Sequence, residues 1–96
     1  MPPKTKLEKE ETIRSLLKRQ IAYIGRADVI RILDMNEKSF QAMEMEFSGN
    51  FPIECYFLVN GPFKTLIYPL VSVLKYVTGT ERTMRILEEE GYTLDD

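Results

Sequence analysis

The sequence predicts a small α+β domain that is mainly helical and contains one β-hairpin. Apolar residues recur at helical spacing over most of the chain, residues 53–59 are dense in β-branched and aromatic side chains, and Asn60-Gly61 directly follows them. A chain of 96 residues, 44% of them apolar and 29% charged, suits one globular domain. The expected element order is α-α-α-β-β-α-α.

The N-terminal part of the chain predicts one helix behind a short lead-in. Residues 1–5, with two prolines, are expected to be disordered, and an N-terminal helical segment follows over residues 6–22. The helix itself is expected from Lys6 to about Ile21, because its apolar residues form a helical stripe. These residues are Leu7, Ile13, Leu16, Leu17 and Ile21.

Two short helices joined by a tight turn are expected next. The first runs from Arg26 to Leu33, and Asn36 is a favourable N-cap for the second, which begins at Glu37. In the second helix, Phe40, Met43 and Phe47 define the inward face at about 100° per residue. The side chains of Lys38, Gln41, Ala42 and Met45 should therefore point outward.

A hairpin and two further helices complete the prediction. Because Pro62 lacks an N–H, we expect a loop of about five residues, Asn60 to Lys64, between the strand over 53–59 and a return strand over Thr65–Tyr68. Pro69 should take the first position of a helix that ends at Gly79. Thr80 should cap a last helix over 80–91, and an acidic tail over 92–96 follows.

Composition excludes several functional classes. The sequence has no histidine and one cysteine, Cys55, and it lacks a Gly-rich phosphate loop, so we expect no catalytic residues, no metal site and no cofactor. A single cysteine suits the reducing cytoplasm, and the longest apolar run, Cys55 to Val59, is far too short to span a bilayer.

The net charge of −2 conceals an uneven distribution. Residues 1–20 carry six cations and three anions, whereas residues 81–96 carry two cations and six anions. Either these are ordinary solvated helix faces, or the basic segment contacts an anionic partner while the acidic end stays away from it or neutralises it.

This order of elements, with two short helices at a tight turn, then a hairpin and a returning helix, is that of a winged helix-turn-helix. Here it would span residues 23–79, with an extra helix at each end. The stretch Ile24 to Phe40 (IGRADVIRILDMNEKSF) resembles the start of the excisionase and AlpA-like, MerR-related small winged-helix proteins. Gly49-Asn50-Phe51-Pro52 matches their Gly-x-Phe-Pro, and Asp34 stands where they have a turn glycine. The resemblance covers Ile24 to Thr78.

This resemblance implies a sequence-specific DNA-binding protein of phage or mobile-element type, acting as a transcription regulator or as an architectural excision factor. Its partners would be double-stranded DNA and a recombinase or RNA polymerase. A homodimer formed through the first or last helix would double the contacts of a lightly charged module. The residues expected to contact DNA are Arg26, Lys38, Ser39, Gln41, Ala42, Lys64 and Thr65.

A second hypothesis keeps the same scaffold as a protein-interaction module that does not bind DNA. Glu37, Glu44 and Glu46 flank the outward face of the helix, and carboxylates are repelled by phosphates. The expected protein contacts are outward-facing Met45, Phe63 at the neutral hairpin tip, and the acidic tail.

Overall fold

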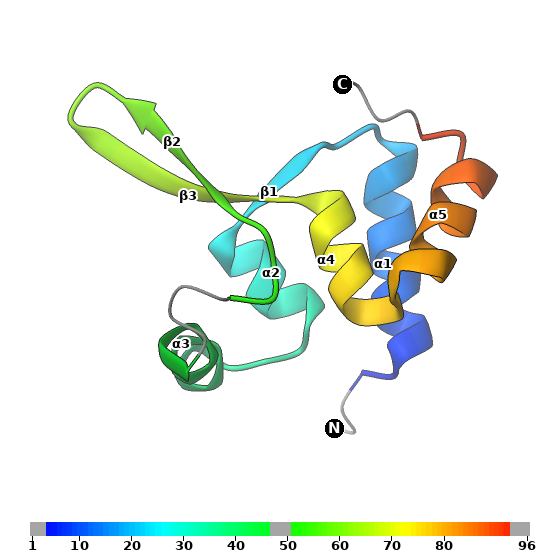
Figure 1. The fold of residues 1–96 in the computed structure, drawn as a ribbon, viewed down its shortest axis with the longest axis horizontal. Helices are drawn as coiled ribbons and strands as arrows, with labels where there is room; N and C mark the ends of the chain where they lie inside the picture. The colour runs from blue at the N-terminus through cyan, green and yellow to red at the C-terminus, as the bar shows by residue number, and fades with distance from the viewer. Residues whose placement is uncertain (1–3, 47–50, 93–96) are drawn as a thin grey trace.

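The computed structural model describes residues 4–46 and 51–92, and within them a helical body carries a hairpin that projects from one side (Figure 1). The fold is α+β, as the sequence predicts. Its elements in chain order are α1 (Lys6–Lys18), β1 (Tyr23–Gly25), α2 (Arg26–Ile32), α3 (Glu37–Glu46), β2 (Tyr56–Asn60), β3 (Phe63–Pro69), α4 (Leu70–Thr78) and α5 (Thr80–Glu89). Three predicted features lie outside the described residues: the inward position of Phe47, the helix end at 48–50 and most of the acidic tail.

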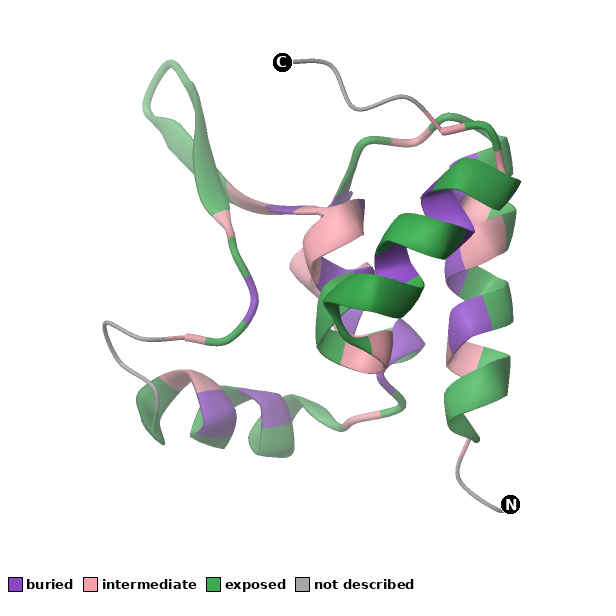
Figure 2. Cartoon of the chain, turned by 45° about the vertical axis from the view of Figure 1, so that its right-hand side comes forward, coloured by how far each residue is buried: buried purple, intermediate pink, exposed green. Residues whose placement is uncertain are grey.

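Helix α4 packs against both α1 and α5, and the three helices form the helical body (Figure 1). Figure 2 shows the buried stripes of these helices turned away from solvent. Each large aliphatic side chain buried in this way stabilises the fold by about 1.5–3 kcal/mol. The buried aliphatic residues are Ile13 and Leu17 from α1, Leu70, Val73 and Leu74 from α4, and Ile86 and Leu87 from α5.

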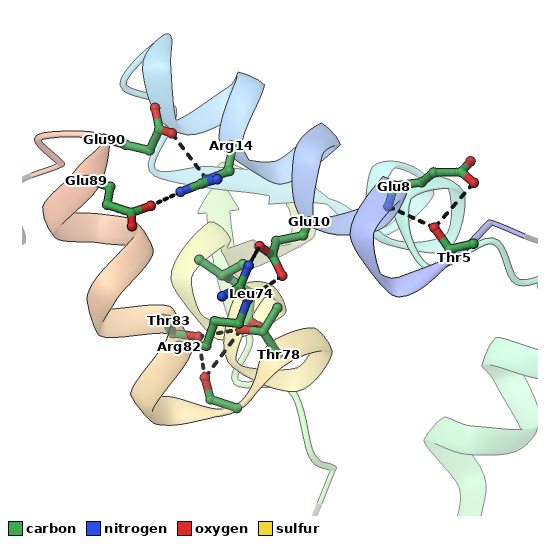
Figure 3. A network of polar contacts seen from close by, with 11 residues as sticks. Thr5, Glu8, Glu10, Arg14, Leu74, Thr78, Arg82, Thr83, Glu89 and Glu90 are labelled. Atoms are coloured by element: carbon green, nitrogen blue, oxygen red, sulfur yellow. Dashed lines mark hydrogen bonds and ion pairs between the residues drawn. The ribbon is translucent and has the colours of Figure 1, made fainter.

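Ion pairs join α1 to α5 across the edge of this body (Figure 3). The Arg82 guanidinium donates two hydrogen bonds to the Glu10 carboxylate, at 2.9 and 2.6 Å, and Glu10 is only 2% exposed. Arg14 pairs with Glu89 and, through Nε at 3.2 Å, with Glu90. Part of the charge of the basic N-terminal segment is therefore neutralised by the acidic C-terminal segment within the chain.

The first helix begins and ends differently from the prediction. The Thr5 hydroxyl accepts a hydrogen bond from the backbone N–H of Glu8 at 3.2 Å, so Thr5 belongs to the helix cap rather than to a lead-in (Figure 3). The helix stops at Lys18 instead of Ile21 because Gln20 adopts a left-handed conformation with φ 58°. The N–H groups of Gln20 and Ile21 then bond to the carbonyls of Leu17 and Leu16, which is a Schellman cap.

The same cap ends α2 and α5. After α2 the left-handed residue is Asp34, with φ 56°, and after α5 it is Gly91, with φ 64°. Asp34 thus adopts the backbone conformation that glycine favours, and its carboxylate also accepts a hydrogen bond from the backbone N–H of Lys4 at 2.8 Å. Aspartate at this turn position is therefore compatible with a tight connection between α2 and α3.

The sheet is antiparallel, in the order β1-β3-β2, and it corrects the predicted hairpin. Asn60 pairs directly with Phe63, so the loop has two residues, Gly61 and Pro62, and not the predicted five. Glycine with φ 63° fits the first central position of a type II′ turn, and the second central position does not need the N–H that proline lacks. The return strand accordingly begins at Phe63, and the first hairpin strand begins at Tyr56 rather than at residue 53.

Strand β1, which the sequence patterns do not predict, pairs with the base of β3. Tyr23, Ile24 and Gly25 lie opposite Pro69, Tyr68 and Ile67. At the following junctions, Pro69 precedes the first residue of α4, and Thr80 is the first residue of α5 while Gly79 takes the cap position. The start of α4 is therefore displaced by one residue from its predicted place, and the cap of α5 is Gly79 rather than the predicted Thr80.

The Glu10–Arg82 pair predicts an acid-dependent contribution to stability. Replacing Arg82 by glutamine (Arg82→Gln) leaves the buried Glu10 carboxylate without the cation that hydrogen-bonds to it, and we expect the variant to be less stable than the wild type at neutral pH. The hydrogen bond from Arg82 holds the pKa of Glu10 below its ordinary value of 4.5. The contribution of the pair is therefore complete above pH 4.5 and is lost as the pH falls through the lowered pKa.

Urea unfolding of the wild type and of Arg82→Gln at neutral and acidic pH measures this contribution. Arg85→Gln, an exposed arginine on the same helix, is the control and should stay close to the wild type. A stability difference for Arg82→Gln that is equal at every pH would contradict the assignment.

Candidate nucleic-acid interface

Helix α3 begins where the sequence predicts, behind a side-chain cap. The Asn36 Oδ1 atom accepts a hydrogen bond from the backbone N–H of Ser39 at 2.7 Å, and α3 starts at Glu37. This bond satisfies one of the free N–H groups in the first turn of the helix. The predicted cap residue and helix start are both confirmed.

A cluster of aromatic rings attaches α3 to the rest of the molecule. Phe40 is fully buried, and its ring meets Phe51 edge-on at 5.7 Å and Tyr68 at 6.3 Å between centroids. Met43 is also buried, and its sulfur accepts a hydrogen bond from the Tyr76 hydroxyl at 3.4 Å. Phe40 and Met43 therefore form the inward face of α3, as predicted.

The opposite face of α3 is exposed and brings four of the predicted DNA-contacting residues together. Lys38, Ser39, Gln41 and Ala42 all lie on the solvent side. Met45 is exposed as well, with 74% of its surface accessible. The described part of α3 thus packs through buried apolar side chains and presents Lys38, Gln41 and smaller side chains to solvent.

Arg26, predicted as a phosphate contact, is instead held within the chain. Its guanidinium pairs with Glu37 and, at 2.7 Å, with Glu44, and it lies 5.1 Å from the centre of the Phe40 ring. Hydrogen bonds from Arg26 to Glu44 and Glu37 raise the pKa of the guanidinium. The sequence does not reveal this arrangement, because Glu44 is 18 residues away from Arg26.

The other two predicted DNA contacts, Lys64 and Thr65, lie on the projecting hairpin and not beside the four residues of α3 (Figure 1). Both are exposed, and as neighbours on β3 they point to opposite faces of the ribbon. Their cross-strand partners are Val59 and Leu58. Phe63, the predicted protein contact, is 72% exposed next to the turn.

A polar contact at the base of the hairpin is absent from the sequence prediction. Glu54 accepts hydrogen bonds from the hydroxyls of Tyr56 at 2.6 Å and Ser72 at 3.2 Å. These bonds lower the pKa of Glu54, and the bond to Glu54 raises the pKa of Tyr56. Glu54 therefore stays ionised and adds negative charge on the hairpin side of the molecule.

The buried aromatic cluster contains one isolated polar atom. The Tyr68 hydroxyl is buried and has no hydrogen-bond partner among the described residues. Burial raises the pKa of Tyr68 to about 12, so this side chain is neutral. The Tyr68 side chain contributes to the fold through its ring, which packs against Phe40.

Searches of protein-family models, of curated proteins and of solved structures give no match to this chain. None of the helices in residues 4–46 and 51–92 has the length and apolar character needed to cross a membrane. Across the same residues, no group of three or more cysteine, aspartate or glutamate side chains is placed to hold a metal ion.

The position of Arg26 predicts a larger stability effect than that of another arginine on the same helix. Arg26→Gln removes two carboxylate partners and the contact with Phe40, and we expect the free energy of unfolding to fall by about 1–2 kcal/mol. Arg31→Gln is the matched control, because the Arg31 side chain is 73% exposed and pairs only with Asp28 among the described residues. We expect it to change stability by less than about 0.5 kcal/mol. Equal losses in thermal or urea unfolding would show that the Arg26 cluster does not hold α3.

Proposed function

We propose that this chain is a double-stranded DNA-binding protein of the winged helix-turn-helix type, in which α2 and α3 are the helix pair and β2–β3 is the wing. The observation that supports this proposal is the exposed face of α3, which carries Lys38, Gln41 and Ala42. Buried Phe40 on the opposite face packs this helix against the rest of the molecule. The resemblance to excisionase and AlpA-like proteins adds the role of a transcription regulator or excision factor. A recombinase or RNA polymerase is then the expected protein partner.

The exposed face of α3 has chemistry suited to base edges. Lysine can donate to guanine or to a phosphate, glutamine can pair with the N6 and N7 atoms of adenine, and alanine can contact a thymine methyl group. On the wing, Lys64 and Thr65 can donate to backbone phosphates. Few phosphates are neutralised, because Arg26 is held by Glu37 and Glu44.

This small number of cations predicts a shallow dependence of DNA affinity on salt. Two lysines that each neutralise one phosphate give a logarithmic slope of about −2 for one copy of the chain. Affinity should therefore depend on base contacts and on more than one copy per site.

A protein-interaction module is the second candidate, and the apolar hairpin favours it. Phe63 on the hairpin and Met45 on α3 are among the most exposed apolar side chains described. Such residues are common anchors of protein interfaces.

Charge reversal on α3 separates the two candidates. A random duplex library is selected against the wild type at low salt, and gel shifts with the enriched duplex are then compared between variants. Lys38→Glu combined with Gln41→Glu should weaken DNA binding by more than roughly tenfold, since each side chain that no longer pairs with its base costs about 1–3 kcal/mol. Phe63→Ala, which leaves the α3 face intact, should retain DNA binding.

Failure to enrich any duplex at low salt would reject the DNA proposal. Retention of DNA binding by the charge-reversed variant would reject α3 as the reading helix. Loss of a protein complex on Phe63→Ala, with no DNA bound by the wild type, would establish the second candidate.

A further inference from the structure

Strand β2 is an exposed sheet edge without the usual protection. All five of its residues, Tyr56 to Asn60, are exposed and uncharged, and β2 stands at the end of the sheet order β1-β3-β2 among the described residues. Figure 2 shows both strands of the hairpin exposed toward the turn. Soluble proteins normally guard such an edge with a charge, a proline or a bulge, and β2 has none of these on its outer side.

The register of the hairpin shows which backbone groups face outward. In a two-residue turn the flanking residues, here Asn60 and Phe63, direct their N–H and C=O groups toward each other. This direction alternates along a strand, so Leu58 and Tyr56 also direct theirs toward β3. Phe57 and Val59 therefore direct their N–H and C=O groups toward the free edge.

We propose that β2 pairs antiparallel with β2 of a second copy of this chain, about a two-fold axis at Leu58. In this register Phe57 lies opposite Val59 of the second copy, and these are the residues whose backbone groups face outward. The dimer would gain two such pairs, each exchanging both backbone hydrogen bonds. Leu58 would face Leu58 of the second copy in the close, non-hydrogen-bonded position, where Cα atoms lie about 4.5 Å apart.

Charge and exposure both favour a second copy as the occupant. No charged side chain lies on β2, and Lys64 sits on β3, so the two Lys64 residues would be three strand spacings apart, or about 14 Å. The four apolar side chains of β2 are between 48% and 68% exposed and alternate between the two faces of the ribbon. Pairing the two edges places them beside the same apolar side chains of the second copy on both faces, so that each copy covers apolar surface of the other.

The two-fold axis at Leu58 allows a test by opposite charges. Leu58→Lys and Leu58→Glu each place like charges in contact across the axis, and we expect each to raise the dimer dissociation constant by roughly 100-fold or more. An equimolar mixture of the two variants should restore a dimer, because lysine then faces glutamate. Light scattering after size exclusion and sedimentation equilibrium measure the mass, and circular dichroism checks that each variant is folded.

Two controls make the test specific to β2. Met84→Lys introduces the same charge at an α5 residue that is 54% exposed, against 55% for Leu58, and should leave the dimer intact. In a Cys55→Ser background, Leu58→Cys should form an intermolecular disulfide on oxidation. Thr65→Cys, on β3, should not form one.

Several results would overturn the proposal. These are a wild-type chain that remains monomeric at millimolar concentration, a mixture of the lysine and glutamate variants that remains monomeric, or equal disruption by Met84→Lys. No DNA is present in these measurements, so the outcome is independent of the function proposed above.

Discussion

The edge-on contact between Phe40 and Tyr68 joins α3 to the base of the hairpin. Phe40 comes from α3 and Tyr68 from the base of the hairpin, and both rings are fully buried. Phe40 and Met43 are the buried side chains of the described part of α3, so the helix has few other attachments to the body. Phe51 also meets Phe40 edge-on, and Arg26 lies over the Phe40 ring. The position of the exposed α3 face therefore depends on this aromatic cluster.

Ion pairs within the chain determine how much charge is left for a partner. Arg14 and Arg82 are paired with glutamates between α1 and α5, and Arg26 is paired with two glutamates of α3. The basic N-terminal segment is thus partly neutralised by the acidic C-terminal segment. The opposite charges at the two ends of the chain make this pairing possible. Of the predicted DNA contacts, Lys38 and Lys64 are the cations that have no carboxylate partner within the described residues.

Local patterns in the sequence predict the α+β class, the Asn36 cap, the start of α3 and its two faces, because each depends on neighbours a few residues away. The end of α1 is missed because Gln20 adopts the left-handed conformation without a glycine to signal it. Strand β1 is missed because it has only three residues, and its partner, the base of β3, lies far along the chain. The pairs of Arg26 with Glu44 and of Glu10 with Arg82 are missed for the same reason, since helical or strand periodicity does not reveal them.

Strand β3 runs without interruption from exposed Phe63 to buried Tyr68, and this continuity has a geometric consequence. The ring that packs against α3 sits on the same strand as the hairpin tip, so one continuous strand separates the two exposed surfaces. Two molecules bound at these surfaces would be held at a spacing and angle set by one chain.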